Sequence, residues 1–324
     1  MAVTAMVTGC ATGPTASEAD SSNPIYQAAQ SERELTWYTA LDPHVADSVI
    51  EAFNTRFPDV QINLLRLTSG QLTARYSQER SAGAVPADVI TSGDDVFEED
   101  GQTRGWFETN PEVPQLATWP KEYASNGSAI VSILPLGIAY NTDSVASAPQ
   151  GWQDLLSDDY ANQLQFGDPR NVPAYMQLAY LMREEYGDDF LREVRAQQPT
   201  VAPSIVNANQ TVAAGGARAV LPGVLQMVED LKDKGAPIDF VQPDNTVGIE
   251  FRTMISTQAA HPNAAKLFMD FMLGADGQRA LNSAAYSPLG EQFGAGSLPA
   301  GYRTVPTSEV KSSEPQILSL LGLQ

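Results

Sequence analysis

The sequence predicts an α/β protein built on doubly wound sheets. The first sign is the stretch LTWYTALDP, Leu35 to Pro43, which is typical of a strand that leads directly into a helix. Two more strand–helix units follow before residue 104, and this repetition is typical of a doubly wound sheet. With 324 residues, the chain is long enough for two lobes, each with its own core.

The first unit places an acidic residue at a strand end. Leu35, Trp37 and Thr39 alternate with other strand-forming residues. Asp42 has the chemistry of a helix N-cap, and Pro43 that of a first helical residue, since proline has no N–H to leave unpaired. Ligands of open α/β sheets bind beyond the carboxyl ends of the strands, so Asp42 is a candidate ligand contact. The alternative is that Asp42 only caps the helix and does not contact a ligand.

The next two units end in small polar residues. Strand 60–67 precedes a helix that begins at Thr68-Ser69-Gly70, and strand 86–93 ends in a turn before a helix opened by Asp94 and Asp95. Exposed N–H groups at the start of a helix form an anion-binding site, and a glycine there leaves the backbone accessible to a ligand. Capping and turn formation are the alternatives. The candidate contacts at this edge are Asp42, Ser69, Gly70, Ser92, Gly93 and Asp94.

The rest of the chain is expected to form a second region and then to cross back to the first. Segment 130–140 is expected to be extended and to leave the first region. Arg170 and Asn171 then lie between a strand and a helix, where Arg170 could pair with an anion or simply be solvated. Asn207 is expected to cap a helix rather than to bind ligand. The other elements expected are strands 164–167, 217–221 and 237–241, helices 174–186, 207–215, 224–234, 262–273, 275–284 and 315–321, and a return crossing at 242–250.

The charge excludes some partners. The 39 acidic residues outnumber the 19 basic ones, which gives a net charge of −20. Such a surface repels phosphate backbones, so nucleic acid is not an expected partner. The acidic run 94–100 is expected to be a solvated face, because it lacks the spacing and glycine of an EF-hand.

Catalysis is not expected. The chain has two histidines, His44 and His261, and contains neither a G-x-S-x-G elbow nor a Walker loop. A carboxylate pair, Asp42 with Asp94, could in principle perform acid–base chemistry, and a cleft hydrolase or lyase is the alternative from another class. The motifs predict no cofactor and no metal cluster.

Cys10 is the single cysteine, so no disulfide can form within the chain. Val7-Thr8-Gly9-Cys10 resembles a bacterial lipobox, and residues 11–23 have the composition of a flexible tether. No stretch reaches the roughly 18 apolar residues of a membrane span. Cys10 is therefore expected to carry a lipid anchor, with a chance lone cysteine as the alternative.

An ordered set of segments resembles the extracellular solute-binding proteins of bacterial ABC importers, in the cluster of ferric-iron, hexose-phosphate and phosphonate binders. The resemblance covers roughly residues 34–290. It implies a type II periplasmic-binding-protein fold with two lobes, two crossovers and a ligand cleft between them. The segments are LTWYTALDPHVADSVIEAFNTRFPDV, LTSGQLTARYSQE, PADVITSGD, LGIAYNTDSV, GWQDLL, the Asp168-Pro169 turn and HPNAAKLFMDFMLGADGQRAL.

The resemblance also implies a domain plan and partners. Residues 1–33 would be lipobox and tether, 34–137 with 246–285 the first lobe, 138–245 the second, and 286–324 a segment packed on the lobes. The partners implied are a small solute, an ABC permease and its ATPase. The expected protein is a monomer without a cofactor, held to the outer face of the cytoplasmic membrane by its lipid alone, at the cell surface or in the periplasm.

The ligand positions of the ferric binders are not retained. By the flanking matches, their histidine falls on Asp42, their glutamate on Gly93, and their tyrosine pair on Leu225-Gln226. Hard ferric ions prefer phenolate and carboxylate oxygens, so ferric binding by that set is excluded. The expected ligand is anionic or zwitterionic: a phosphonate, sugar phosphate or carboxylate. A polyamine, or ferric iron at a site without tyrosine, is the alternative. Arg170, Asn171 and Asn207 complete the candidate contacts.

Overall fold

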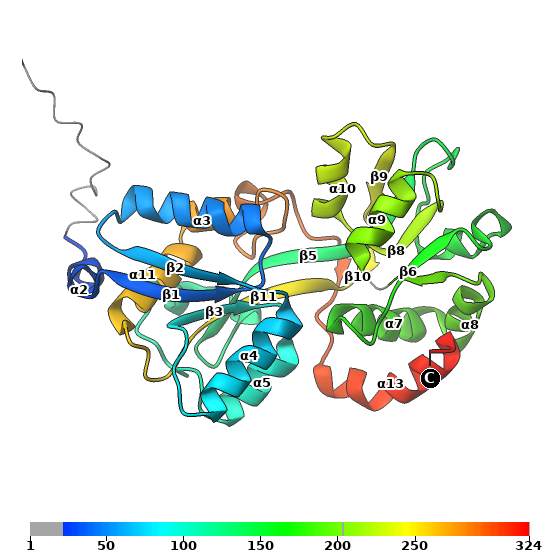
Figure 1. Cartoon of the computed structure of the whole chain (residues 1–324). Coiled ribbons are helices and arrows are strands. Elements are labelled where there is room, and N and C mark those ends of the chain that lie inside the picture. Colours follow the sequence, from blue (N-terminus) through cyan, green and yellow to red (C-terminus); the bar gives the residue numbers. More distant parts are fainter. Residues whose placement is uncertain (1–21, 203, 324) are drawn as a thin grey trace, which may run out of the picture.

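The structure, a computed structural model, describes residues 22–202 and 204–323 and shows two α/β regions side by side (Figure 1). Cys10 and most of the predicted tether lie outside the described residues. The strands are β1 Glu34–Thr39, β2 Gln61–Arg66, β3 Val89–Ser92, β4 Ala124–Ser125, β5 Ser128–Asn141, β6 Leu164–Gly167, β7 Thr200–Ala202, β8 Ala219–Val224, β9 Ile238–Val241, β10 Asn245–Thr246, β11 Gly248–Ile255 and β12 Gly301–Tyr302. The α-helices are α2 Pro24–Glu32, α3 Pro43–Arg56, α4 Ser69–Ser81, α5 Asp95–Thr103, α6 Pro114–Thr118, α7 Pro173–Tyr186, α8 Asp188–Ala196, α9 Ile205–Ala213, α10 Leu225–Lys232, α11 Pro262–Leu273, α12 Ala275–Leu281 and α13 Thr307–Leu321.

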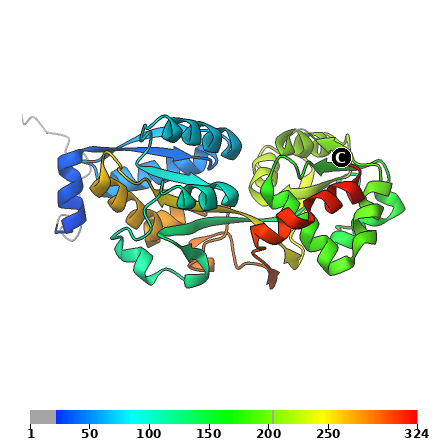
Figure 2. The same cartoon turned by 90° about the horizontal axis from the view of Figure 1, so that it is seen from below.

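Two long strands, β5 and β11, connect the regions (Figure 2). The strand order is β2-β1-β3-β11-β5-β8-β6-β7, with β1 parallel to both β2 and β3. The first part of β5 pairs with β11, whereas its last part, from Leu136 on, pairs with β8 and β9. The α/β fold expected from the sequence is confirmed, and the expected crossing at 130–140 is this long strand.

Aromatic side chains fill the core of the first region. Phe53 of α3 lies edge-on to Phe268 of α11, with ring centroids 5.2 Å apart, and Phe268 also meets Trp37 of β1 at 5.0 Å. The three side chains are fully buried. Their burial explains the helical spacing of apolar residues after Pro43, because that spacing turns one side of α3 toward the sheet.

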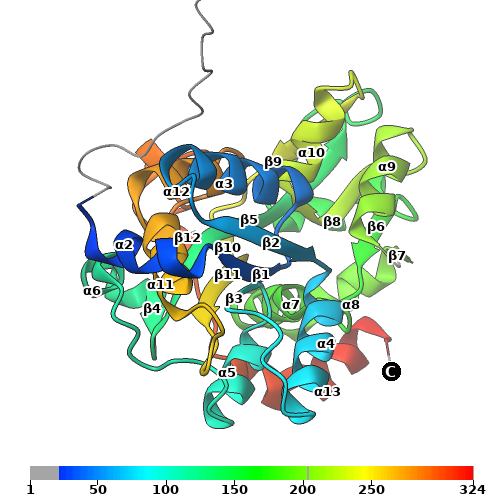
Figure 3. The ribbon, with the colours of Figure 1, turned by 60° about the vertical axis from the view of Figure 1, so that its left-hand side comes forward.

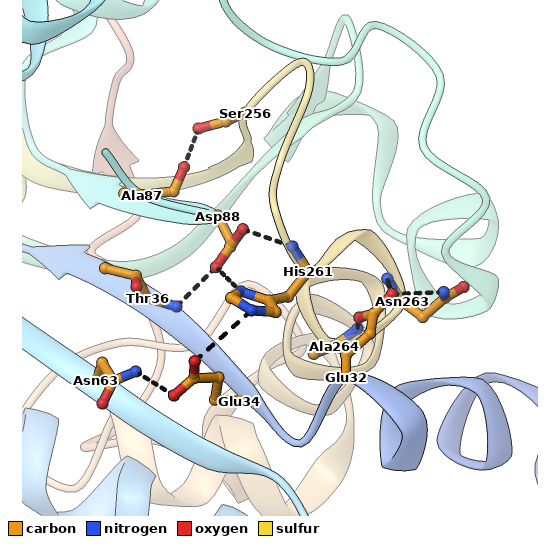
Figure 4. Close-up of polar contacts among 10 residues, drawn as sticks. All are labelled: Glu32, Glu34, Thr36, Asn63, Ala87, Asp88, Ser256, His261, Asn263 and Ala264. Carbon is orange, nitrogen blue, oxygen red and sulfur yellow. Dashed lines mark hydrogen bonds and ion pairs between the residues drawn. The ribbon is translucent and has the colours of Figure 1, made fainter. Parts of the chain in front are cut away.

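Residues 24–32 differ from the predicted tether. They form α2, which packs against α11 and buries Tyr26 and Ala29. The Glu32 carboxylate accepts bonds from the backbone N–H groups of Asn263 and Ala264, at 3.2 and 2.8 Å, and so caps α11 (Figure 4). A side chain from α2 therefore satisfies N–H groups at the start of α11.

In the second region, α7, α8 and α13 lie on one side of the strands and α9 and α10 on the other (Figure 1). Two sequence expectations were wrong here, and two elements were missed. Helix α8 and strand β7 were not predicted, although α8 buries Phe190 and Leu191 on one side. Helix α9 begins after Ser204, so Asn207 is inside it and is not its cap. Helix α13 begins at Thr307 and passes through Pro315, supported by packing on α7 and α8.

None of the helices in the described part of the chain is long and apolar enough to cross a membrane.

Candidate functional site

Three helices begin at one place between the two regions. Asp95, Pro173 and Thr307, the first residues of α5, α7 and α13, line two adjoining cavities of about 270 and 200 Å³. The start of α13 reaches α5 of the first region, although α13 packs on α7 and α8 (Figure 3). Positive ends of three helix dipoles therefore meet at these cavities.

The Asp95 carboxylate lies at this meeting point. Its Oδ2 accepts hydrogen bonds from Gln177 Nε2 of α7 at 3.0 Å and from Thr307 Oγ1 of α13 at 2.6 Å. Its Oδ1 accepts a bond from the Val96 N–H at 3.0 Å. The chain's own anion thus occupies the place where helix N-termini favour negative charge.

Asp94 is the N-cap of α5, as the sequence predicted. Its carboxylate accepts from the Phe97 N–H at 3.1 Å and from Thr73 Oγ1 at 3.4 Å. Burial raises the pKa of the Asp94 carboxyl above its ordinary value, and the neighbouring Asp95 raises it further, against the Phe97 hydrogen bond. Because it lines the larger cavity, Asp94 offers a carboxylate that a cationic ligand group would stabilise.

Arg170 and Asn171 line the larger cavity, but the Arg170 guanidinium is already engaged. Arg170 Nε and Nη2 donate to the two carboxylate oxygens of Asp168 at 2.9 and 2.7 Å, and Nη1 donates to the Leu323 carbonyl at 3.1 Å. The hydrogen bond from Arg170 lowers the pKa of Asp168. Arg170 is therefore a weaker anion site than a free guanidinium would be.

The ionisable groups of the cavities are mostly acidic. Arg252, in the smaller cavity, forms an ion pair with Glu98 at 3.3 Å. Lys311 of α13 adds an ammonium to the larger cavity, and it has no ion-pair partner among the described residues. The lining carboxylates are Asp94, Asp95, Glu98, Glu99, Glu250 and Glu314. The arrangement fits a cationic or zwitterionic solute better than a purely anionic one.

Gly93 lines the smaller cavity, whereas Ser92 does not. A Cβ at Gly93 would lie 2.8 Å from Ile249 Cγ2, so the packing of β11 leaves little space for a side chain there. Ser92 is 1 % exposed, and its hydroxyl has no hydrogen-bond partner among the described residues. The two neighbours predicted together thus have different surroundings.

The other sequence candidates lie outside both cavity linings. Asp42 caps α3 through a 2.9 Å bond from the His44 N–H. Ser69 and Gly70 open α4, where Thr68 makes no side-chain capping bond, so the first N–H groups of the helix lack that cap. Asn207 is exposed on α9, and its carbonyl accepts a bond from Thr211. The cavities therefore join Gly93, Asp94, Arg170 and Asn171 but not these four residues.

The sequence analysis missed Gln177, Thr307 and Lys311. Gln177 lies one turn beyond Pro173 and could have been found from the helix predicted there. Thr307 and Lys311 could not, because the chain before Pro315 shows no apolar periodicity that would predict a helix.

The cluster of His261, Asp88 and Glu34 is relevant to the alternative that the chain is an enzyme (Figure 4). His261 Nδ1 lies 3.0 Å from Asp88 Oδ2, while Nε2 faces Glu34 Oε1 at 3.8 Å. The nearby Ser256 hydroxyl donates to the Ala87 carbonyl rather than to the imidazole. Both ring nitrogens therefore face carboxylates, and no hydroxyl nucleophile is activated in this geometry. Asp88 also accepts from the N–H groups of Thr36 and His261, which makes the cluster a clamp between β1, β3 and α11.

Comparisons with known proteins give a family and a fold. Residues 85–301, more than half of the chain, match the family model described as bacterial extracellular solute-binding protein. A search of curated proteins found no match.

Several solved structures share the fold. The substrate-binding protein of an ABC transporter from Agrobacterium tumefaciens matches with a TM-score of 0.77 and 16 % identity, over 90 % of this chain and 96 % of that one. Iron-bound HitA from Pseudomonas aeruginosa matches at 0.69 and 18 %, over 89 % and 98 %. AfuA from Actinobacillus pleuropneumoniae, with fructose-6-phosphate bound, matches at 0.68 and 21 %, over 90 % and 99 %. At these identities the likeness establishes the fold alone.

Proposed function

The chain belongs to the bacterial extracellular solute-binding proteins, and on that premise we propose that it captures a small zwitterionic solute between two lobes and delivers it to an ABC permease. The family implies a small-molecule ligand, a permease partner and a location outside the cytoplasm. Membership supports transport binding rather than catalysis.

The lobes of the proposal are the predicted ones: residues 34–137 with 246–285, and residues 138–245. The pairing of β5 supports this division, because the strand changes partners from β11 to β8 and β9 at Leu136. Segment 286–324 is assigned to neither lobe, since α13 packs on α7 and α8 while Thr307 bonds to Asp95 of α5.

The larger cavity is the observation that supports the ligand class most directly. It brings the partly buried carboxylate of Asp94 to the same 270 Å³ space as the ammonium of Lys311, which has no ion-pair partner in the described part of the chain. An amine on the solute would lie against Asp94, and a carboxylate, phosphate or phosphonate would lie toward Lys311. A purely anionic solute is not expected, because Arg170 is engaged with Asp168.

A thermal-shift screen tests the ligand class. The panel consists of amino acids, aminophosphonates, sugar phosphates, polyamines and ferric salts, each at high concentration. A ligand at about a hundred times its dissociation constant stabilises the fold by about 2.7 kcal/mol, which is readily measured. Stabilisation by zwitterions supports the proposal, and stabilisation only by sugar phosphates or only by polyamines contradicts it.

Two charge-neutralising variants then locate the site. Asp94→Asn keeps a good N-cap and removes the charge, and Lys311→Gln removes the ammonium. Each should weaken binding of the zwitterion found in the screen, measured by calorimetry. Lys234→Gln, an exposed lysine beyond the cavity linings, is the control and should bind like the parent. Equal affinities in all three variants would place the site elsewhere. Recovery of the solute chemically unchanged, by mass spectrometry, tests binding against turnover.

The lipid anchor at Cys10 is a separate proposal that rests on the sequence alone. Mass spectrometry of the N-terminal peptide from membranes should show a diacylglyceryl thioether on Cys10. An unmodified Cys10 on protein recovered from the culture medium would contradict it.

A further inference from the structure

Side-chain hydrogen bonds join α5 to α7 and α13 at one atom. In the described part of the chain, the bonds from Gln177 Nε2 and Thr307 Oγ1 both end on Asp95 Oδ2. Helix α5 is fixed to the first region by Phe97, whose ring lies 5.7 Å from that of Tyr76. Helices α7 and α13 pack against each other. Each of the two bonds therefore connects the two regions at a point away from β5 and β11.

Thr307 is brought to Asp95 by the segment that precedes it. Tyr302 and Thr304 both donate from their hydroxyls to Glu250 Oε1 of β11, at 2.6 Å each. Arg303 forms an ion pair with Glu185 of α7 at 2.7 Å. The segment is thus attached to a connecting strand and to the second region before α13 begins, which fixes the direction from which Thr307 approaches.

We propose that Asp95, Gln177 and Thr307 form a closure latch, a set of affinity-determining residues that stabilises the arrangement in which the lobes enclose the cavities. The charge on Asp95 strengthens both bonds, and the N-termini of α7 and α13 face it with positive dipole ends. The apparent affinity for a solute increases with the fraction of molecules that is already closed before the solute binds. Because the latch increases that fraction, it raises the apparent affinity. This last consequence rests on the proposed function, whereas the latch itself does not.

The latch is tested without any ligand, by the distance between spin labels on the two regions. Labels are placed at Asp47→Cys of α3 and Asp233→Cys beyond α10, both exposed, in a chain with Cys10→Ser. In that background, Thr307→Val and Asp95→Ala remove the two ends of the α13 bond. Thr103→Val is the matched control, because the Thr103 hydroxyl donates to the Glu99 carbonyl of its own helix and to no other group among the described residues.

Thr307→Val and Asp95→Ala should both shift the distance distribution toward longer values, with the open-to-closed ratio changed on the order of tenfold. Thr103→Val should leave it unchanged. The double variant should open little further than Asp95→Ala, because the two residues share one bond. Unchanged distributions in both single variants, with folding verified by circular dichroism, would overturn the latch. A shift in Asp95→Ala alone would overturn the part assigned to α13. Because no solute is added, these outcomes are independent of the ligand screen.

Discussion

Arg170 grips the carboxylate of Asp168, two residues earlier in the chain, through Nε and Nη2 at 2.9 and 2.7 Å. The Arg170 guanidinium is therefore bonded within the turn that precedes α7. The first prediction follows from the pKa of Asp168, which the Arg170 hydrogen bond lowers in the folded state. A lowered folded-state pKa contributes stability above the ordinary aspartate value, and that contribution is lost as the pH falls through the lowered pKa.

Arg170→Met should therefore destabilise the fold at neutral pH, and the difference from the parent should shrink in acid, as measured by urea unfolding at pH 7 and pH 3. Arg192→Met is the control. It should show little effect, because the Arg192 side chain is 54 % exposed, its nearer partner Asp189 is 83 % exposed, and its second partner Asp188 lies 3.7 Å away. A difference that persisted undiminished at low pH would assign the Arg170 contribution to something other than the Asp168 charge.

The second prediction concerns Asp94, whose pKa is raised by burial. A carboxyl with a raised folded-state pKa destabilises the fold when ionised, and this cost disappears as the pH falls below the ordinary aspartate value. Asp94→Asn keeps the cap without the charge, so its stability relative to the parent should be most favourable at neutral pH and should decline on acidification. Thermal unfolding from pH 3 to pH 7 measures this. A constant offset across that range would show that the charge of Asp94 is not the cause.

The third prediction concerns the clamp around Asp88, which is 2 % exposed and accepts bonds from the N–H groups of Thr36 and His261 and from the His261 imidazole. Asp88→Ala leaves partly buried donors unpaired and should cost about 3 kcal/mol in urea unfolding. Asp189→Ala, an exposed surface acid, should cost a small fraction of that. Similar losses in the two variants would rule out the clamp.

The fourth prediction concerns the long connecting strand. A Cβ at Gly137 of β5 would lie 2.5 Å from the Val241 carbonyl oxygen and would collide with the Phe240 ring. Gly137→Ala should destabilise the fold by about 1 to 3 kcal/mol, because both neighbours belong to the paired strand β9. A Cβ at Gly151 meets nothing within 4 Å, so Gly151→Ala is the matched control. Equal denaturant midpoints would show that β9 can move aside at no cost.

Local signals predicted the parts of the site that depend on neighbouring residues. Asp42 with Pro43, and Asp94 before Asp95, identify helix starts by the chemistry of the cap, and the structure confirms both caps. Asn207 shows the limit of this reasoning, because asparagine also occurs inside a helix when its side chain is exposed, and here Ser204 precedes the helix.

Contacts between distant segments were not predictable in the same way. The Asp95–Thr307 bond joins residues 212 positions apart, and Thr307 belongs to a helix start that has no apolar periodicity around it. Arg170 bonds to Asp168, which is close to it in sequence. The geometry of this pair nevertheless depends on how the turn places the buried Asp168. The fold could therefore be predicted from periodicity and caps, whereas the closure of the cavities could not.

The last prediction is that ferric ions do not stabilise this chain. Gly93 has no side-chain ligand and little space for one, since a Cβ there would lie 2.8 Å from Ile249 Cγ2. Leu225 and Gln226, the first residues of α10, supply no phenolate, and the Asp42 carboxylate caps α3. In the described part of the chain, no group of three or more histidine, cysteine, aspartate or glutamate side chains is arranged to hold a metal ion. A hard trivalent ion needs several such oxygen ligands.

Ferric citrate should leave the melting temperature unchanged to within the error of the measurement, with citrate alone as the control. A rise seen with ferric citrate but not with citrate, and abolished by Asp94→Asn, would show instead that the acidic cavity binds iron without tyrosine.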